Sequence, residues 1–188
     1  MLYSLTLHSN CVFVTIHTLI KTKEKNMRSR RVTFITQAAM IAAIYVVLTL
    51  FVSAFNLASG AIQIRISEAL TVLPAFTPAA IPGLFVGCLI SNLMSGCLPL
   101  DVVFGSLATL IGACGSYLLR KWKWAVPIPP ILSNALIVPF VLSYVYHIPG
   151  GIPYFMLTVG IGQIISCGVL GMIMYRILAK YRNVIFKK

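Results

Sequence analysis

The sequence predicts an all-α integral membrane protein with six membrane-spanning helices. Only 10% of its 188 residues are charged and 59% are hydrophobic, whereas a soluble domain of this length needs more polar surface to cover its core. A spanning helix takes about 20 apolar residues, so the chain has room for about six spans with short loops. The apolar runs are continuous and lack the alternation of barrel strands, which excludes a β-barrel.

The first 26 residues differ from the rest of the chain. Their apolar piece, Cys11–Ile20, is too short to span, and the basic residues follow it, which inverts the order of a secretory signal peptide. Met27 opens the stretch MRSRRVTFITQAAM, which is typical of a cytoplasmic start before a first span. We therefore expect residues 1–26 to be a disordered extension or a mis-assigned start. Residues 27–188 are expected to form a single membrane domain.

Six apolar segments follow Met27. They are Thr33–Phe55, the short SEALTVLPAF, TPAAIPGLFVGCLISNLM, Leu100–Leu119, Trp124–Tyr146 and Ile152–Tyr175. Pro74, Pro78 and Pro82 interrupt the second and third segments, so two short or tilted helices fit there better than one long helix. Gly96–Pro99 is predicted to be a turn between the third and fourth segments.

Basic residues are concentrated in three blocks that predict the topology. Fourteen of the fifteen lie within residues 21–31, 120–123 and 176–188, which leaves Arg65 alone. Basic blocks beside spans usually face the cytoplasm. Four crossings before the second block and two after it put all three blocks inside, so both termini are predicted to be cytoplasmic. This pattern favours a membrane topology over nucleic-acid binding as the reason for the basic composition.

Ionisable residues near the outer ends of the predicted spans are the first candidates for ligand binding. The topology places Arg65, Glu68, Asp101 and His147 there, where a charged side chain is costly to keep. Arg65 and Glu68 are three residues apart, close enough to pair on one helix face. An interfacial ion pair is therefore the alternative to a binding role for Arg65. His147 could line a lid, but a histidine at such a position is more often merely interfacial.

Three amides inside the spans complete the set of candidates. Asn92, Asn134 and Gln163 each need a hydrogen-bond partner in an apolar environment, which a neighbouring helix could supply instead of a ligand. Carboxylates and amides facing an outer cavity would suit a ligand rich in N–H donors, because each carboxylate can accept a bidentate pair.

The first span carries a different signal. Ala38, Ala39, Ala42 and Ala43 form two overlapping pairs of small residues spaced four apart. Small side chains at this spacing let another helix approach closely in lipid, where packing replaces the hydrophobic driving force. We expect this surface to contact another helix.

Motifs for catalysis, nucleotide binding and metal binding are missing. The chain has no phosphate-binding GxxxxGK[ST] loop, no HExxH and no Ser/His/Asp arrangement. Its five cysteines show no metal-ligand spacing and are assigned no chemistry. We expect no catalytic residue, metal or cofactor, and if ATP powers transport, another chain hydrolyses it.

Several stretches resemble the queuosine-precursor transporter family. QIRISEALTVLP, PAAIPGLFVGCLISNL, LDVVFGSLATLIGA and PPILSNALIVPF carry the resemblance, which covers roughly residues 30–181. The resemblance implies a six-helix S component of an energy-coupling factor (ECF) transporter in the bacterial cytoplasmic membrane. It implies docking of the first helix, through Ala38/Ala42 or Ala39/Ala43, onto a transmembrane coupling subunit driven by two ATPase subunits.

The same resemblance implies the ligand. The implied ligand is a 7-deazapurine, namely a 7-deazaguanine such as preQ1 or preQ0. Such a molecule offers ring N–H and amino donors and, in its aminomethyl form, a cationic amine. Glu68 and Asp101 would bind those two groups, and Asn134 would bind the purine carbonyl. The chain departs from the family pattern in the last span, where GIGQ places Gln163 instead of a glutamate. Three alternatives remain: an S component for another vitamin-like ligand, a stand-alone channel or carrier, and a membrane enzyme. A channel or carrier would need a polar inner half, and an enzyme would need a catalytic cluster. The sequence shows neither.

Overall fold

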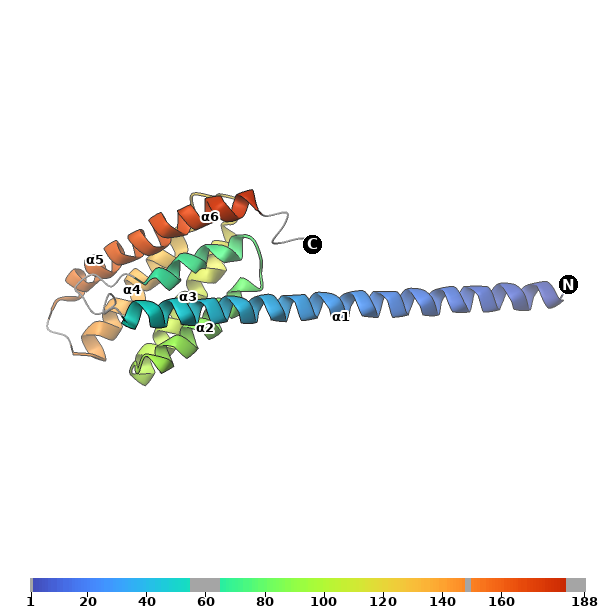
Figure 1. Cartoon of the computed structure of the whole chain (residues 1–188), viewed down its shortest axis with the longest axis horizontal. Coiled ribbons are helices and arrows are strands. Elements are labelled where there is room, and N and C mark those ends of the chain that lie inside the picture. The colour runs from blue at the N-terminus through green and yellow to red at the C-terminus, as the bar shows by residue number, and fades with distance from the viewer. Residues whose placement is uncertain (1, 55–64, 148–149, 182–188) are drawn as a thin grey trace. The chain divides into compact units, whose positions relative to one another are not determined.

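The computed structural model describes residues 2–54, 65–147 and 150–181, and of residues 2–26 only the backbone. These residues form helices and no strand, which confirms the predicted all-α class. The elements are α1 (Leu2–Ala54), η1 (Ile66–Ala75), α2 (Ala80–Met94), α3 (Pro99–Leu118), α4 (Ile128–Tyr144), α5 (Ile152–Gln163), η2 (Ile164–Leu170) and α6 (Gly171–Lys180) (Figure 1). Here η1 is a 3-10 helix and η2 is a π-helix.

The chain divides into two compact units, Met1–Thr36 and Gln37–Lys188. The first unit holds the N-terminal part of α1, and the second holds the rest of α1 and all other elements. Helix α1 begins at Leu2, so the backbone of residues 2–26 is helical. That residues 1–26 are an extension or a mis-assigned start stays a prediction. The contacts and sites described below lie in the second unit.

Within the described residues, three helical stretches are long and apolar enough to cross a membrane. They are Met27–Ala54, Pro99–Leu118 and Ile152–Lys180, while η1, α2 and α4 are shorter apolar helices. The two short segments predicted around the prolines are present as η1 and α2, with Pro74 inside the first. The connector predicted between the first span and η1 lies mostly outside the described residues.

Two predicted spans have different boundaries in the structure. The fifth was expected to begin at Trp124, but α4 begins at Ile128 after a series of turns. Pro129 and Pro130 occupy the first turn of α4, where their missing N–H groups cost nothing. The last span continues to Lys180 as α5, η2 and α6 in succession.

Helices of the second unit pack around α3 and η1. Helix α3 contacts α2 on one side and α4 on another, and α4 also packs against α5. The short η1 contacts α2, α3, η2 and α6, so it is surrounded by helices. Eight of its ten residues are consequently buried, including Glu68.

Helices α1 and α2 approach each other through glycines. A Cβ on Gly83 would lie 2.7 Å from the carbonyl oxygen of Ala38, and one on Gly87 would lie 2.9 Å from the Cβ of Tyr45. Such distances are too short for any side chain, so the two backbones meet directly at these positions. Ala38 and Ala42 of the predicted small-residue surface therefore contact α2 of the same chain.

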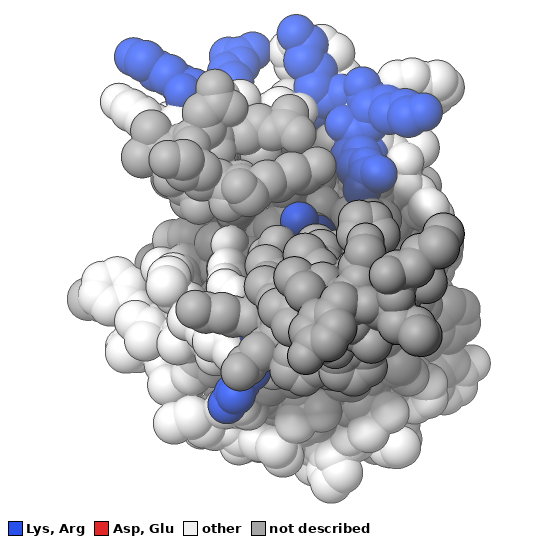
Figure 2. All heavy atoms as spheres, turned by 90° about the vertical axis from the view of Figure 1, so that its right-hand side faces the viewer, with Lys and Arg blue, Asp and Glu red and all other residues white. Residues whose placement is uncertain are grey.

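The second and third basic blocks meet at one end of the unit. The Arg176 guanidinium lies over the Trp124 ring, 5.6 Å from its centroid, and the Phe76 ring contacts the Tyr175 ring at this end. Leu98 and Tyr146 are in contact at the opposite end of α3, where the Leu98 amide donates to the Tyr146 hydroxyl. Figure 2 shows Lys and Arg side chains standing out on one face, with no described acidic side chain visible among them.

The glycine contacts predict a specific sensitivity to small substitutions. Gly83→Ala should lower the free energy of unfolding by about 1–3 kcal/mol, because its methyl group meets backbone that cannot easily move. Gly160→Ala is the matched control, since its Cβ would meet only Ala135 at 4.0 Å. This change should be neutral or stabilising by up to about 1 kcal/mol. Thermal unfolding in detergent measures both, and equal shifts would contradict the described contact between α1 and α2.

Candidate functional site

The Glu68 carboxylate lies at the centre of the second unit. Glu68 belongs to the short helix η1 and is only 1% exposed, although burial of a carboxylate among apolar groups is costly. The Tyr45 hydroxyl of α1 donates to Oε1 at 2.6 Å, and the Asn134 amide of α4 lies 3.4 Å from Oε2. Three separate elements therefore position this carboxylate.

The two Glu68 oxygens differ in how firmly they are held. The 2.6 Å bond to Oε1 is short, as expected for a charge-assisted hydrogen bond. The 3.4 Å contact to Oε2 is longer than an ordinary hydrogen bond, and the same Asn134 nitrogen also donates to the Pro130 carbonyl at 3.1 Å. Oε2 therefore retains the capacity to accept hydrogen bonds from a ligand.

A second group of side chains fixes the backbone around Glu68. The Thr71 hydroxyl and the Cys167 thiol both donate to the Glu68 carbonyl, at 2.6 and 3.4 Å. The Cys167 thiol also lies 3.1 Å from Oε1 of Gln163. Gln163, predicted as a binding residue, thus belongs to the same polar core through Cys167.

Asn92 is joined to this core through Cys88. The Asn92 amide and the Thr109 hydroxyl both lie within hydrogen-bonding distance of the Cys88 sulfur, at 3.6 and 3.4 Å. All three residues are buried. We use the name polar core for the buried set Tyr45, Glu68, Thr71, Cys88, Asn92, Thr109, Asn134, Gln163 and Cys167.

Asp101 lies at the edge of this core, near the first turn of α3. Its Oδ2 accepts a hydrogen bond from the Tyr146 hydroxyl at 2.8 Å, and it is only 6% exposed. A Cβ on Gly105 would lie 3.1 Å from the Asn92 amide nitrogen and 3.6 Å from Oδ1 of Asp101, so these two polar groups are neighbours. The two carboxylates thus occupy separate positions, and Asn92 lies near that of Asp101.

Tyr146 follows the end of α4 and contacts Asp101 at the edge of the polar core. Burial and the hydrogen bond to Asp101 raise the pKa of its hydroxyl above the usual value. The hydroxyl therefore stays protonated at neutral pH and remains a donor to the carboxylate.

Arg65 does not form the ion pair with Glu68 that was the alternative to a binding role. It is partly buried immediately before η1, within electrostatic range of both Glu68 and Asp101. Among the described residues no ion pair joins it to Glu68; instead the Glu68 amide donates to its carbonyl at 3.0 Å. The cause is the short 3-10 helix, which begins after Arg65 and leaves that residue extended.

Two sets of predicted residues fall outside the polar core. His147 is exposed, with φ of 50°, in the turn that follows α4, and residues 148–149 of the predicted lid turn lie outside the described residues. The four alanines are divided between two surfaces. Ala38 and Ala42 pack against α2, so they cannot also form a free docking surface, whereas Ala39 and Ala43 are exposed.

The prediction missed five members of the core. Tyr45, Thr71, Thr109 and the two buried cysteines, Cys88 and Cys167, gave no signal, because such residues are common in apolar spans and pack there as small or aromatic groups. Ser166, in the π-helix η2, was also missed. Among the described residues, its hydroxyl is the buried side-chain polar atom without a hydrogen-bond partner.

An apolar helical unit with a buried polar core connected to one end is typical of a membrane protein that binds a small polar molecule. The model of the QueT transporter family matches residues 35–180. The chain therefore belongs to the QueT transporter family, a family of multi-pass membrane transporters.

A curated relative agrees with this assignment. The chain is 35% identical over 85 residues to the queuosine precursor transporter QueT of Lactococcus lactis subsp. cremoris, an alignment of 45% of this chain and 50% of the relative. The aligned part thus spans half the length of that protein. No solved structure matches the chain.

The Tyr45–Glu68 contact gives a direct test of the polar core. Tyr45→Phe removes the donor to Oε1 and should lower the free energy of unfolding by about 1–3 kcal/mol. Tyr144→Phe is the matched control, because Tyr144 is 66% exposed. Thermal unfolding of both variants in detergent measures the difference. A Tyr45→Phe protein as stable as the control would show that Glu68 does not depend on this hydroxyl.

Proposed function

We propose that the chain is the substrate-binding S component of an ECF transporter that imports a queuosine precursor. Its membership of the QueT transporter family supports this function, as does the name of the Lactococcus lactis relative. The observation that carries the proposal is the buried Glu68 carboxylate, held at one oxygen by Tyr45 and with acceptor capacity left at the other.

The ligand that suits this site is a 7-deazaguanine in its aminomethyl or nitrile form. Glu68 accepts the ring N–H and the amino group of the guanine edge, as a carboxylate can accept two parallel donors. Asn134, beside Glu68, turns toward the purine carbonyl, and Asp101 receives the cationic aminomethyl group. Gln163 is neutral, so in this assignment it contributes hydrogen bonds and no charge.

The other components of the transporter are a transmembrane coupling subunit and two ATPase subunits in the bacterial cytoplasmic membrane. These ATPase subunits hydrolyse the ATP that powers import. Ala39 and Ala43 remain exposed on α1 and are the positions through which we propose that the coupling subunit docks.

The carboxylates give the first test of the proposed ligand. Glu68→Gln and Asp101→Asn should each weaken binding of the aminomethyl 7-deazaguanine by about thirty- to several-thousand-fold, because losing one partner of a buried charge-assisted contact costs about 2–5 kcal/mol. Asp101→Asn should lose little affinity for the neutral nitrile form, whereas Glu68→Gln should lose affinity for both forms. Titration of the purified variants with both ligands measures this.

Controls separate the proposed site from general damage to the protein. Glu24→Gln makes the same change at the third acidic residue of the sequence, and its affinity should not change. Mass spectrometry of ligand released from the unmodified protein identifies what it retains. Unchanged affinities in both carboxylate variants would exclude this site, and retention of a different class of molecule would exclude the ligand.

The alanine positions give a second test, which concerns coupling. Ala43→Trp places a bulky group on the exposed side of α1, so it should abolish uptake and co-purification of the coupling subunit while ligand affinity stays within about twofold. Ala42→Trp should instead lower stability, since Ala42 packs against Gly87. Ile111→Trp, at an exposed position of α3, is the control and should retain uptake. Normal uptake by the Ala43→Trp protein would contradict the docking proposal.

A further inference from the structure

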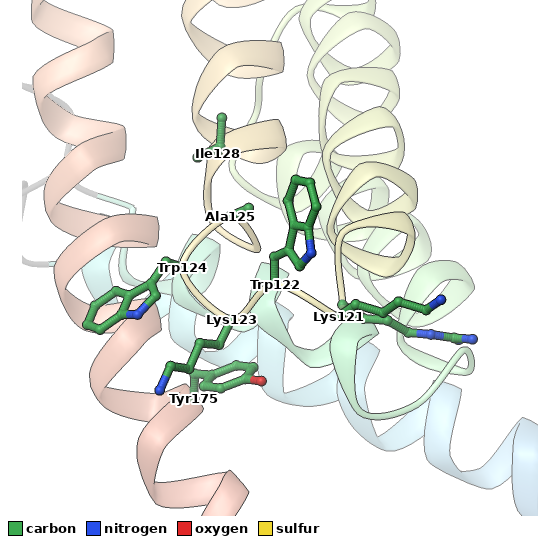
Figure 3. Close-up of a pocket in the computed structure, with 8 residues that line it drawn as sticks. Lys121, Trp122, Lys123, Trp124, Ala125, Ile128 and Tyr175 are labelled. Atoms are coloured by element: carbon green, nitrogen blue, oxygen red, sulfur yellow. The ribbon is translucent and has the colours of Figure 1, made fainter.

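A hollow lies at the end of the second unit where the basic blocks meet. It has a volume of about 750 Å³ and is lined by Lys121, Trp122, Lys123, Trp124, Ile128 and Tyr175, among others. Figure 3 shows the two indoles pointing away from each other, Trp124 toward α6 and Trp122 along α4. The hollow thus combines cationic, aromatic and apolar groups, and it lies at the opposite end of α3 from Asp101.

Aromatic rings orient the cations that line the hollow, Lys123 and Arg120, and Arg176 beside it. The Trp124 ring has the Lys123 ammonium 5.7 Å from its centroid and the Arg176 guanidinium 5.6 Å from it. The Arg120 guanidinium lies 4.2 Å from the centroid of the Tyr117 ring. Contacts of this kind orient a cation but leave its charge uncompensated.

The unit cannot neutralise these charges with its own acids. The sequence has three acidic residues, of which Glu68 and Asp101 are buried and bonded to Tyr45 and Tyr146. The third, Glu24, belongs to the first unit. Among the described residues no ion pair involves Arg120, Lys121, Lys123 or Arg176, so the hollow attracts an anion from outside the chain.

An apolar stripe leads away from the hollow along α4. Ile128, Leu132 and Leu136 are four residues apart and therefore lie on one side of the helix, and they are 47%, 54% and 51% exposed. The stripe begins at Ile128, which also lines the hollow. A phosphate group bound by the cations would thus be next to a surface suited to hydrocarbon.

We propose that this hollow binds the headgroup of an anionic membrane phospholipid, with an acyl chain along the α4 stripe. Basic groups between helices at the cytoplasmic side of a membrane bind such headgroups, and an arginine fork matches phosphate geometry. Tryptophan at this depth is favourable because its ring is amphipathic. An acidic protein segment would use the same cations but would have no use for the stripe, which favours a lipid.

The sequence provides a direct probe of this site. Its two tryptophans, Trp122 and Trp124, both line the hollow, so all intrinsic tryptophan fluorescence reports on it. The full chain is reconstituted in phosphatidylcholine vesicles, to which phosphatidylglycerol or phosphatidylcholine brominated near the headgroup end of the acyl chains is added. The brominated phosphatidylglycerol should quench the tryptophan fluorescence at a mole fraction at least about fivefold lower than the brominated phosphatidylcholine does. Equal quenching by the two lipids would overturn the proposal.

Charge variants locate the effect within the hollow. Lys123→Gln and Arg176→Gln should each reduce the preference for phosphatidylglycerol by about fivefold, the factor that corresponds to about 1 kcal/mol per cation. Lys180→Gln is the matched control, because Lys180 lies over Tyr181 instead of Trp124. The Lys180→Gln variant should keep the full preference for phosphatidylglycerol. If it loses as much of that preference as Arg176→Gln does, the effect comes from general surface charge and the proposal is overturned.

A soluble anion distinguishes the lipid from other ligands. Glycerol phosphate carries the same charged group without an acyl chain and should not displace brominated phosphatidylglycerol at an equal or moderately higher concentration. Displacement at equal concentration would show that the stripe contributes nothing and would overturn the lipid assignment. Displacement by the coupling subunit alone would likewise assign the hollow to a protein partner.

Discussion

A carboxylate buried in an apolar bundle has to be surrounded by donors, and in this chain the donors come from helices far apart in the sequence. Glu68 receives the Tyr45 hydroxyl from α1 and lies beside the Asn134 amide of α4. Thr71 and Cys167 bond to its backbone carbonyl. Because an unsatisfied charge at this depth would cost several kcal/mol, the positions of η1, α1 and α4 are tied to one another through this residue.

The same constraint explains why the short helix η1 can exist in the interior. A ten-residue 3-10 helix has poorer hydrogen-bond geometry than an α-helix and rarely extends this far. Here helices α2, α3, α6 and η2 surround it, and its polar side chains find partners on α1, α4 and η2. Packing and side-chain hydrogen bonds therefore stabilise a backbone conformation that the local sequence alone would not favour. The ligand proposed above would bind at the point where this support is concentrated.

The sequence was sufficient for the class of fold and for the division into six apolar segments, because length and hydropathy determine both. It was also sufficient for Glu68, Asn134 and Asp101 as buried polar residues, since polar groups within an apolar run stand out. Partners such as Tyr45 and Cys88 could not be found this way. Their side chains are ordinary in a membrane helix, and only the three-dimensional arrangement brings them to the carboxylate.

The alanines of α1 show how a correct signal can have an ambiguous meaning. The spacing predicted a close helix contact, and Ala38 and Ala42 form one with Gly83 and Gly87. That contact is internal to the chain. The glycines on α2 that complete it lie forty-five residues further along the sequence and form no recognisable motif. The spacing of small residues identifies a contact surface but not the helix that occupies it.

The π-helix η2 has a consequence for how this chain can vary. The span from Ile152 to Lys180 carries Gln163 before η2 and Arg176 after it. An α-helix turns the chain by about 100° per residue, whereas a π-helix has i→i+5 hydrogen bonds and takes about one more residue per turn. Deleting one residue within η2 would therefore return it to α-helical geometry and turn α6 only slightly relative to α5. Deleting one residue in α6 before Arg176 would instead rotate Arg176 by about 100° away from Trp124, while Gln163 kept its place beside Cys167. Related chains that differ by one residue in this segment should therefore differ within η2.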